Sequence, residues 1–212
     1  DNVVTVTVTN ESGNSSSCTA TVSIEVEDTT PPTALAVDSL TVSLDASGNG
    51  SLEVSDVNNG SFDARGIASM SISQTSFACV DLGYQEVILT VMDSAGHVST
   101  ATTVVEVQDT ISPIVACQDV LLTVADTGSV ALTASDLLSS SSDNCSIASM
   151  SLSDSVFTAS AEGDNVVTVT VTDQSGNSSS CTATVSIEVE DTTAPTALAV
   201  DSLTVSLDAS GN

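Results

Sequence analysis

Hydrophobic and polar residues alternate along much of this chain. In the stretch "VVTVTVTD" (166–173), Val167, Val169 and Val171 fall on one face and the intervening threonines fall on the other. This period of two residues is typical of a strand with one buried face. The stretch "VILTVMD" (87–93) has the same pattern, with valine, leucine and valine on the face that we expect to be buried.

A turn and a second alternating stretch follow each of these predicted strands. The turns read "DSAGH" (93–97) and "DQSGN" (173–177), in which Gly and Asn favour left-handed backbone conformations and Asp can bond its own turn amides. The stretch "CTATVSIEVE" (181–190) then alternates again, so the pair is predicted to form a β-hairpin. No stretch has a sustained helical period.

Further short strands are predicted upstream of each hairpin. They lie in "ALAVDSLTVSLD", "GSLEVSDV" and "IASMSISQTSF", with Gly, Asn and Asp between them. About seven strands in roughly 80 residues is typical of an antiparallel β-sandwich of immunoglobulin type. We therefore expect an all-β fold of tandem immunoglobulin-like modules.

The sequence also repeats itself. Residues 1–27 return at 164–190 and residues 28–49 return at 191–212, so the period is 163 residues, and "DTTPP" at 28, "DTISP" at 109 and "DTTAP" at 191 mark a weaker half repeat. Self-similarity of this kind is the signature of a repeat protein. The predicted segments are the C-terminal part of a preceding module (1–27), a first-type module (28–108), a second-type module (109–190) and the N-terminal part of the next module (191–212). We read the chain as an excerpt from a longer array in which the two types alternate.

Charge narrows the possible partners. The chain has 28 acidic residues, a single basic residue (Arg65), and a formal net charge of −27. Phosphate binding needs Lys and Arg, so we expect neither nucleic acid nor anionic lipid as a partner. No apolar run reaches the roughly 20 residues that a membrane-spanning helix needs, so we expect no membrane insertion. Cations are the natural counterpart of such a chain.

Catalysis has little support in the residues. The chain has one histidine, His97, in a turn position that the second module fills with Asn177, and it has no lysine. A nucleophile, a base and an orienting acid would each need a position that the repeat does not offer. We therefore predict that the protein is not an enzyme.

The frame "DTxxP…CQD…G…DNC…VTVTVTDQSGNSSSCTATVSIEVED" resembles the hyalin repeat, an immunoglobulin-like module found in tandem in extracellular proteins, including very long bacterial surface adhesins. The resemblance covers both complete modules and both partial ones. Its most specific part is the D-x-S-G-N turn with the following S-x-C-T-A-T-V strand. The resemblance implies an extended, secreted or cell-surface stalk, but it does not name a ligand.

The resemblance also gives an interpretation of the cysteines. Cys117, in the first strand of the second module, and Cys181, in the last, resemble the paired cysteines of the family, and in the first module Ala36 and Ala101 stand at these positions. Loss of both together is what a bonded pair would show. We predict a Cys117–Cys181 disulfide, worth roughly 4 kcal/mol on the chain-entropy model. Cys18 is expected to pair with a cysteine upstream of this sequence.

Two cysteines are left over by this scheme. The family commonly has a further pair, of which the first module keeps only Cys79, with Arg65 at the other position, and the second keeps only Cys145, with Ala159 at the other. One interpretation is that both are free, partly buried thiols. The other is that they bond to each other or to another chain. Sequence reasoning leaves both open.

Acidic side chains are expected to converge at the start of each module. In an immunoglobulin-like sandwich, the linker into the module, the loop before the third strand and the turn of the last hairpin lie at one end. These segments carry Glu27, Asp28, Asp63 and Asp93 in the first module, and Asp109, Asp143 and Asp173 in the second. Hard oxygen ligands suit Ca²⁺, so we predict calcium at these junctions. The alternative is that these aspartates only cap turns in solvated loops.

Three functions from different classes compete. The first, which we favour, is a structural stalk or filament repeat of an extracellular, cell-surface adhesin-like protein, whose partners are neighbouring modules and other copies of the chain in a filament. The second is an adhesive module that itself binds glycan or protein. The third is an accessory domain of a secreted enzyme. Near-identical repetition favours the stalk, because a recognition site would need one distinctive set of loops.

Overall fold

The computed structural model describes residues 2–199, 201–206 and 208–211, so the outermost predicted limits, at Asp1 and Asn212, lie outside the described residues. The chain divides into two compact units. The first comprises residues up to Leu44 together with Asn49–Gln108, and the second comprises Asp45–Gly48 together with the residues from Asp109 onward. Each unit is described by itself.

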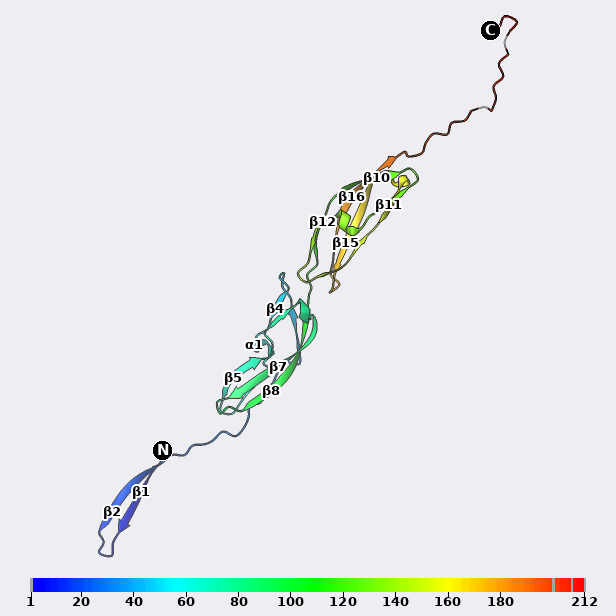
Figure 1. The fold of residues 1–212 in the computed structure, drawn as a ribbon. Coiled ribbons are helices and arrows are strands. Elements are labelled where there is room, and N and C mark those ends of the chain that lie inside the picture. The colour runs from blue at the N-terminus through cyan, green and yellow to red at the C-terminus, as the bar shows by residue number, and fades with distance from the viewer. Residues whose placement is uncertain (1, 200, 207, 212) are drawn as a thin grey trace. The chain divides into compact units, whose positions relative to one another are not determined.

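The first unit contains a four-stranded sheet, a smaller pair of strands and an N-terminal hairpin (Figure 1). The large sheet has the order β3 (Ser39–Ser43), β8 (Val98–Gln108), β7 (Gly83–Asp93) and β5 (Ile67–Ile72), and β4 (Asn49–Ser51) pairs with β6 (Ser76–Ala78). A one-turn helix, α1 (Val54–Val57), and a 3-10 turn (Cys79–Asp81) lie in the connections. β7 and β8 form the predicted hairpin, with Leu89 opposite Ala101.

The second unit repeats this plan. Its large sheet has the order β10 (Val120–Ala125), β16 (Ser178–Glu190), β15 (Gly163–Asp173) and β13 (Ile147–Leu152); β11 (Ser129–Ala131) pairs with β14 (Val156–Thr158), and β12 (Leu138–Ser142) pairs with β9 (Ile114–Cys117). The short helix α2 (Ala134–Leu137) and a 3-10 turn (Ala159–Ala161) complete it. Figure 1 shows β15 and β16 lying side by side.

The alternating valines form the core of both units. In the second unit, Val167, Val169 and Val171 of β15 are fully buried and pack in one cluster with Leu137 and Phe157, which come from the facing segments. Val87, Leu89 and Val91 are fully buried in the same way in the first unit. The predicted all-β, immunoglobulin-like sandwich is therefore confirmed, and the period-two pattern identified its buried face correctly.

Two local features differ from the expected antiparallel pattern. β3 pairs with β8, and β10 with β16, in parallel, because the chain crosses over between these strands instead of turning back directly. The stretch "GSLEVSDV", expected to be a strand, is only partly one. Its second half forms α1, in which Asp56 Oδ2 accepts a 2.8 Å hydrogen bond from the Glu53 amide and so stabilises a helical turn.

The repeated end segments are packed differently from their internal copies. β1 (Asn2–Thr9) and β2 (Ser15–Val22) form the same hairpin as β15 and β16, yet its valines are exposed. Val6 is 51% exposed, whereas its copy, Val169, is fully buried. Among the described residues after Glu190, none lies in a helix or strand, although the copy of this segment forms β3.

Candidate metal site

Three aspartates meet at one end of the second unit. Asp109 lies in the segment before β9, Asp143 follows β12, and Asp173 is the last residue of β15. Each can offer one carboxylate oxygen, and these oxygens all lie within 4.8 Å of one another. We call this group the second-module acidic site. It brings together all three residues that sequence reasoning placed at this junction.

The second-module acidic site is largely closed to solvent. Asp109 is only 6% exposed and Asp173 only 2%. Asp109 Oδ1 accepts hydrogen bonds from the Ile111 amide (3.1 Å) and from Asn144 Nδ2 (3.0 Å). Asp143 Oδ2 accepts one from the Cys145 amide (3.0 Å). Asp109 Oδ2 and Asp143 Oδ1 are buried and have no hydrogen-bond partner among the described residues.

Asn177 holds Asp173 and the start of the module together. Its backbone amide donates to Asp173 Oδ1 and its side-chain Nδ2 donates to Asp173 Oδ2, both at 2.8 Å. The same Nδ2 donates to the carbonyl oxygens of Asp109 (3.1 Å) and Ile111 (3.4 Å). Asn177 therefore fixes one ligand residue against the segment that carries another.

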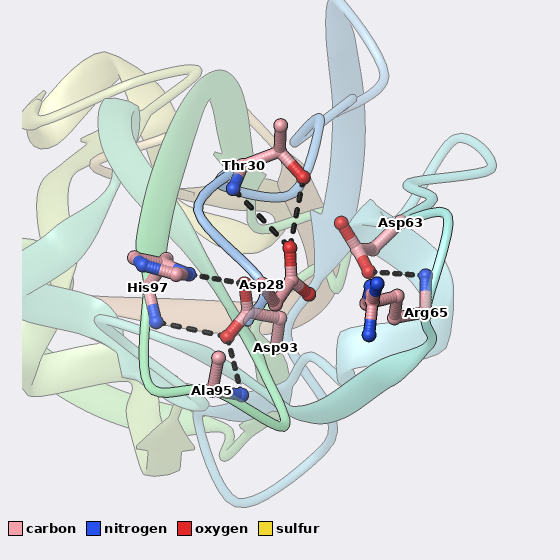
Figure 2. Close-up of polar contacts among 7 residues, drawn as sticks. All are labelled: Asp28, Thr30, Asp63, Arg65, Asp93, Ala95 and His97. Atoms are coloured by element: carbon pink, nitrogen blue, oxygen red, sulfur yellow. Dashed lines mark hydrogen bonds and ion pairs between the residues drawn. The ribbon is translucent and has the colours of Figure 1, made fainter. Parts of the chain in front are cut away.

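The corresponding group in the first unit has a different composition. Asp28, Asp93 and His97 offer ligand atoms within 4.8 Å of one another. Figure 2 shows His97 bound to Asp93, and Thr30 bound to the neighbouring Asp28. His97 Nδ1 lies 2.8 Å from Asp93 Oδ2, and Asp28 Oδ1 accepts hydrogen bonds from the Thr30 amide (3.2 Å) and hydroxyl (3.0 Å). We call this group the first-module site.

Asp93 is held in its charged form by these contacts. Burial raises the pKa of Asp93, but hydrogen bonds from the His97 ring and from the amides of His97 and Ala95 outweigh burial and lower the pKa below its ordinary value of 3.8. Asp93 Oδ1 accepts both amide bonds, at 2.9 and 2.8 Å. The His97 ring thus contacts one carboxylate oxygen of Asp93 directly.

Two of the predicted calcium residues lie outside the first-module site. Glu27 and Asp63 are not members of the group that can hold an ion. Asp63 Oδ1 instead accepts a 2.7 Å bond from the Arg65 amide (Figure 2). The Arg65 guanidinium donates to the Val26 carbonyl oxygen at 3.0 Å. The role of His97 was missed, because a lone turn histidine carries no signal until its neighbours are known.

The second unit contains a disulfide between Cys117 and Cys181. It joins β9 to β16, with 5.8 Å between the Cα atoms and a sequence separation of 64 between the two cysteines. This is the pair that the family resemblance implied. The bond crosses from one sheet to the other and closes most of the module into a single loop.

The interpretation of Cys79 and Cys145 as free thiols is wrong, because both are disulfide-bonded. The resemblance could not pair either within its own module, since Arg65 and Ala159 occupy the expected partner positions. Comparison of the modules one by one therefore predicted no partner for either cysteine. Cys18, in β2, is an exposed free thiol among the described residues.

No helix in the described part of the chain is both long and apolar enough to cross a membrane.

Comparison with known families gives one match. Residues 108–187 match the model of the HYR domain, which covers the second module. No curated protein matches the chain.

Several solved structures show a limited similarity to this chain. Protocadherin gamma B7 extracellular cadherin domains 1–4 is 12% identical with a TM-score of 0.35, over 85% of this chain and 56% of that one. Mouse clustered PcdhgC3 EC1–3 is 12% identical with a TM-score of 0.37, over 89% and 77%. An endo-fucoidan hydrolase of glycoside hydrolase family 107 is 14% identical with a TM-score of 0.26, over 74% and 34%. This chain spans just over half the length of the first of these, and likeness at these values carries no conclusion about ligand or activity.

Proposed function

Residues 108–187 form a hyalin-repeat-like module, and from this premise we propose that the chain is a structural repeat of an extracellular, adhesion-type surface protein. In this role it gives a stalk or filament its length and mechanical strength and performs no catalysis. The observation that carries the proposal is the 163-residue repetition of near-identical sequence. Repetition multiplies length, whereas recognition needs a distinctive site.

The cross-linked core supports a mechanical role. The Cys117–Cys181 disulfide ties β9 to the C-terminal strand β16, so tension entering at the start of the module passes to its end through a covalent bond. The loop between the two cysteines stays shielded from extension while the disulfide is intact. A disulfide also fits an oxidising, extracellular environment.

Calcium is the cofactor that we propose for this repeat. The net charge of −27 needs counter-ions, and carboxylate oxygens gather at one end of each unit. A bound divalent cation would relieve the repulsion between those carboxylates and stiffen the segment that leads into the module. The partners that we propose are neighbouring modules and further copies of the chain.

Single-molecule force spectroscopy of the 212-residue chain tests the stalk. Each unit should unfold in a separate event at a well-defined force. Cys117 and Cys181 are 64 positions apart in sequence, so replacing both with alanine should lengthen the extension of the second unit by up to roughly 220 Å at about 3.5 Å per residue. The first unit has Ala36 and Ala101 at the equivalent positions, so its extension should be the same with and without this replacement.

Two results would contradict the proposal that the chain is a stalk repeat. One is extension of the folded units without a measurable unfolding force. The other is strong, specific binding of the isolated chain to members of a glycan panel, which would favour an adhesive module.

A further inference from the structure

The two candidate metal sites differ in a way that the repeat alone does not reveal. In the second-module acidic site, Asp109 Oδ2 and Asp143 Oδ1 are buried with no hydrogen-bond partner among the described residues. No such atom belongs to Asp28, Asp93 or His97 in the described part of the first unit. Among the described residues, one site therefore has buried carboxylate oxygens without a donor and the other has none.

A buried carboxylate oxygen without a donor is unfavourable. Asp109 is 94% buried, since it is 6% exposed, and its charge has lost most of its contact with water. A charged group in that position normally has a basic partner or a metal ion. The chain has no lysine and its single arginine, Arg65, lies in the first unit, so no basic side chain of the second unit can serve. A cation from solution is the remaining source of positive charge.

The donor set selects the kind of cation. All three side chains of the second-module acidic site present oxygen, and no histidine or free thiol is a member of the group. Calcium accepts six to eight oxygen ligands in flexible geometry, including waters, whereas zinc favours nitrogen and sulfur and magnesium demands near-ideal octahedral geometry. Three aspartates from three separate segments, completed by water, fit calcium best.

In the first-module site, a histidine side chain already pairs with one of the carboxylates. His97 stands where the second module has Asn177, and its Nδ1 binds Asp93 Oδ2 at 2.8 Å. Ala64 stands where the second module has Asn144, whose Nδ2 donates to Asp109 Oδ1 at 3.0 Å. The first module thus lacks both amide side chains that orient the carboxylates of the second.

We infer that calcium binds the second-module acidic site and not the first-module site, so that ion-binding and ion-free modules alternate along the repeat. This inference rests on the proposed role of calcium as cofactor. The inference also explains why two module types alternate. The acidic end of one type would be stabilised by an ion, and that of the other by a histidine–aspartate pair.

Isothermal titration of CaCl₂ into the chelator-treated 212-residue chain tests the inference. The titration is done in about 0.15 M NaCl, which screens weak attraction to the acidic surface, and with magnesium in excess. The expected stoichiometry is one calcium ion per chain. Calcium should also raise the melting temperature of the second unit and leave that of the first unchanged.

Matched variants locate the site. Asp143→Asn removes one ligand charge at a partly exposed loop, and should weaken calcium binding by at least about tenfold. Asp63→Asn is the same change at the equivalent position of the first module and should leave binding unchanged. The double change Ala64→Asn with His97→Asn copies the second-module residues into the first module and should create a second calcium site. Circular dichroism checks that each variant keeps its β structure.

Several results would overturn the inference. Two ions per chain in the unaltered protein would show that the modules are equivalent, although calcium would remain the cofactor. A loss of affinity in Asp63→Asn would place the ion in the first module. If the chain binds no calcium at all, the proposal of calcium as cofactor is wrong as well. The proposed stalk is tested separately, by the force measurements.

Discussion

Leu89 and Ile88 are neighbours in β7 with opposite environments. Leu89 is fully buried in the core of the first unit, whereas Ile88 points outward and is 38% exposed. Leu89→Ala should destabilise the first unit by about 2–5 kcal/mol, because it removes buried methyl groups and leaves a cavity. Ile88→Ala should change the stability by no more than about 0.5 kcal/mol. Urea unfolding followed by circular dichroism measures both, and equal effects would mean that the strand is not buried on one face.

This residue pair also shows what the sequence could predict at the finest scale. The alternation of apolar and polar residues identified every buried apolar position in β7 and β15, because side chains on a strand must alternate between faces. The contacts of His97 could not be predicted. They depend on Asp28 and Asp93, which are 65 residues apart in sequence and adjacent only in the folded unit.

At the scale of elements, the helix α2 depends on one carboxylate. Asp136 Oδ2 accepts hydrogen bonds from the Thr133 amide and hydroxyl, both at 2.7 Å, and these bonds lower the pKa of Asp136 below its ordinary value of 3.8. A lowered pKa in the folded state means that ionised Asp136 stabilises the fold above its unfolded pKa. That contribution is lost as the pH falls through the folded value.

Asp136→Asn should therefore lower the melting temperature at neutral pH and have a smaller effect in acid. The difference between the two proteins should be constant above about pH 5 and shrink below about pH 4, where aspartates begin to take up protons. Thermal melts from pH 3 to pH 7 would measure it. A difference that does not depend on pH would mean that the charge of Asp136 contributes nothing to the cap.

The repeated segments show which elements are encoded locally. The hairpin sequence folds at 2–22 as it does at 165–185, with Val6 opposite Cys18 as Val169 is opposite Cys181, because its register is set by its own turn. The strand β3 behaves differently, since it pairs in parallel with β8 about 60 residues later in the chain. Its copy at 202–206 is exposed and lies in no sheet. Sequence reasoning found both patterns but could not tell which of them needs a distant partner.

At the scale of the whole molecule, the two units should respond separately to loss of a disulfide. Replacing both Cys117 and Cys181 with alanine should destabilise the second unit by roughly 4 kcal/mol, because the unfolded chain regains the freedom of a long loop. The first unit has its own core and should keep its stability. Differential scanning calorimetry should show one transition move to lower temperature and one stay. A shift of both transitions by the same amount would mean that the units unfold together.

The repeat organisation is the feature that can be predicted most directly from the sequence. The 163-residue period and the recurring Asp-Thr segments can be read directly from the amino-acid sequence. The disulfide bonding of Cys79 and Cys145 could not be predicted in this way. Comparison between modules pairs cysteines only within one module, and neither module has cysteines at both positions of this family pair.

The isolated position of Arg65 has a consequence for the lifetime of such a protein outside the cell. Proteases of the trypsin type cleave after lysine or arginine, and this chain offers them one bond, between Arg65 and Gly66. Such an enzyme must bind the arginine guanidinium in its specificity pocket. Here the guanidinium already donates a hydrogen bond to the Val26 carbonyl oxygen. A surface built from these repeats would therefore present long stretches of polypeptide to proteases of the trypsin type with almost no bond that they can cut.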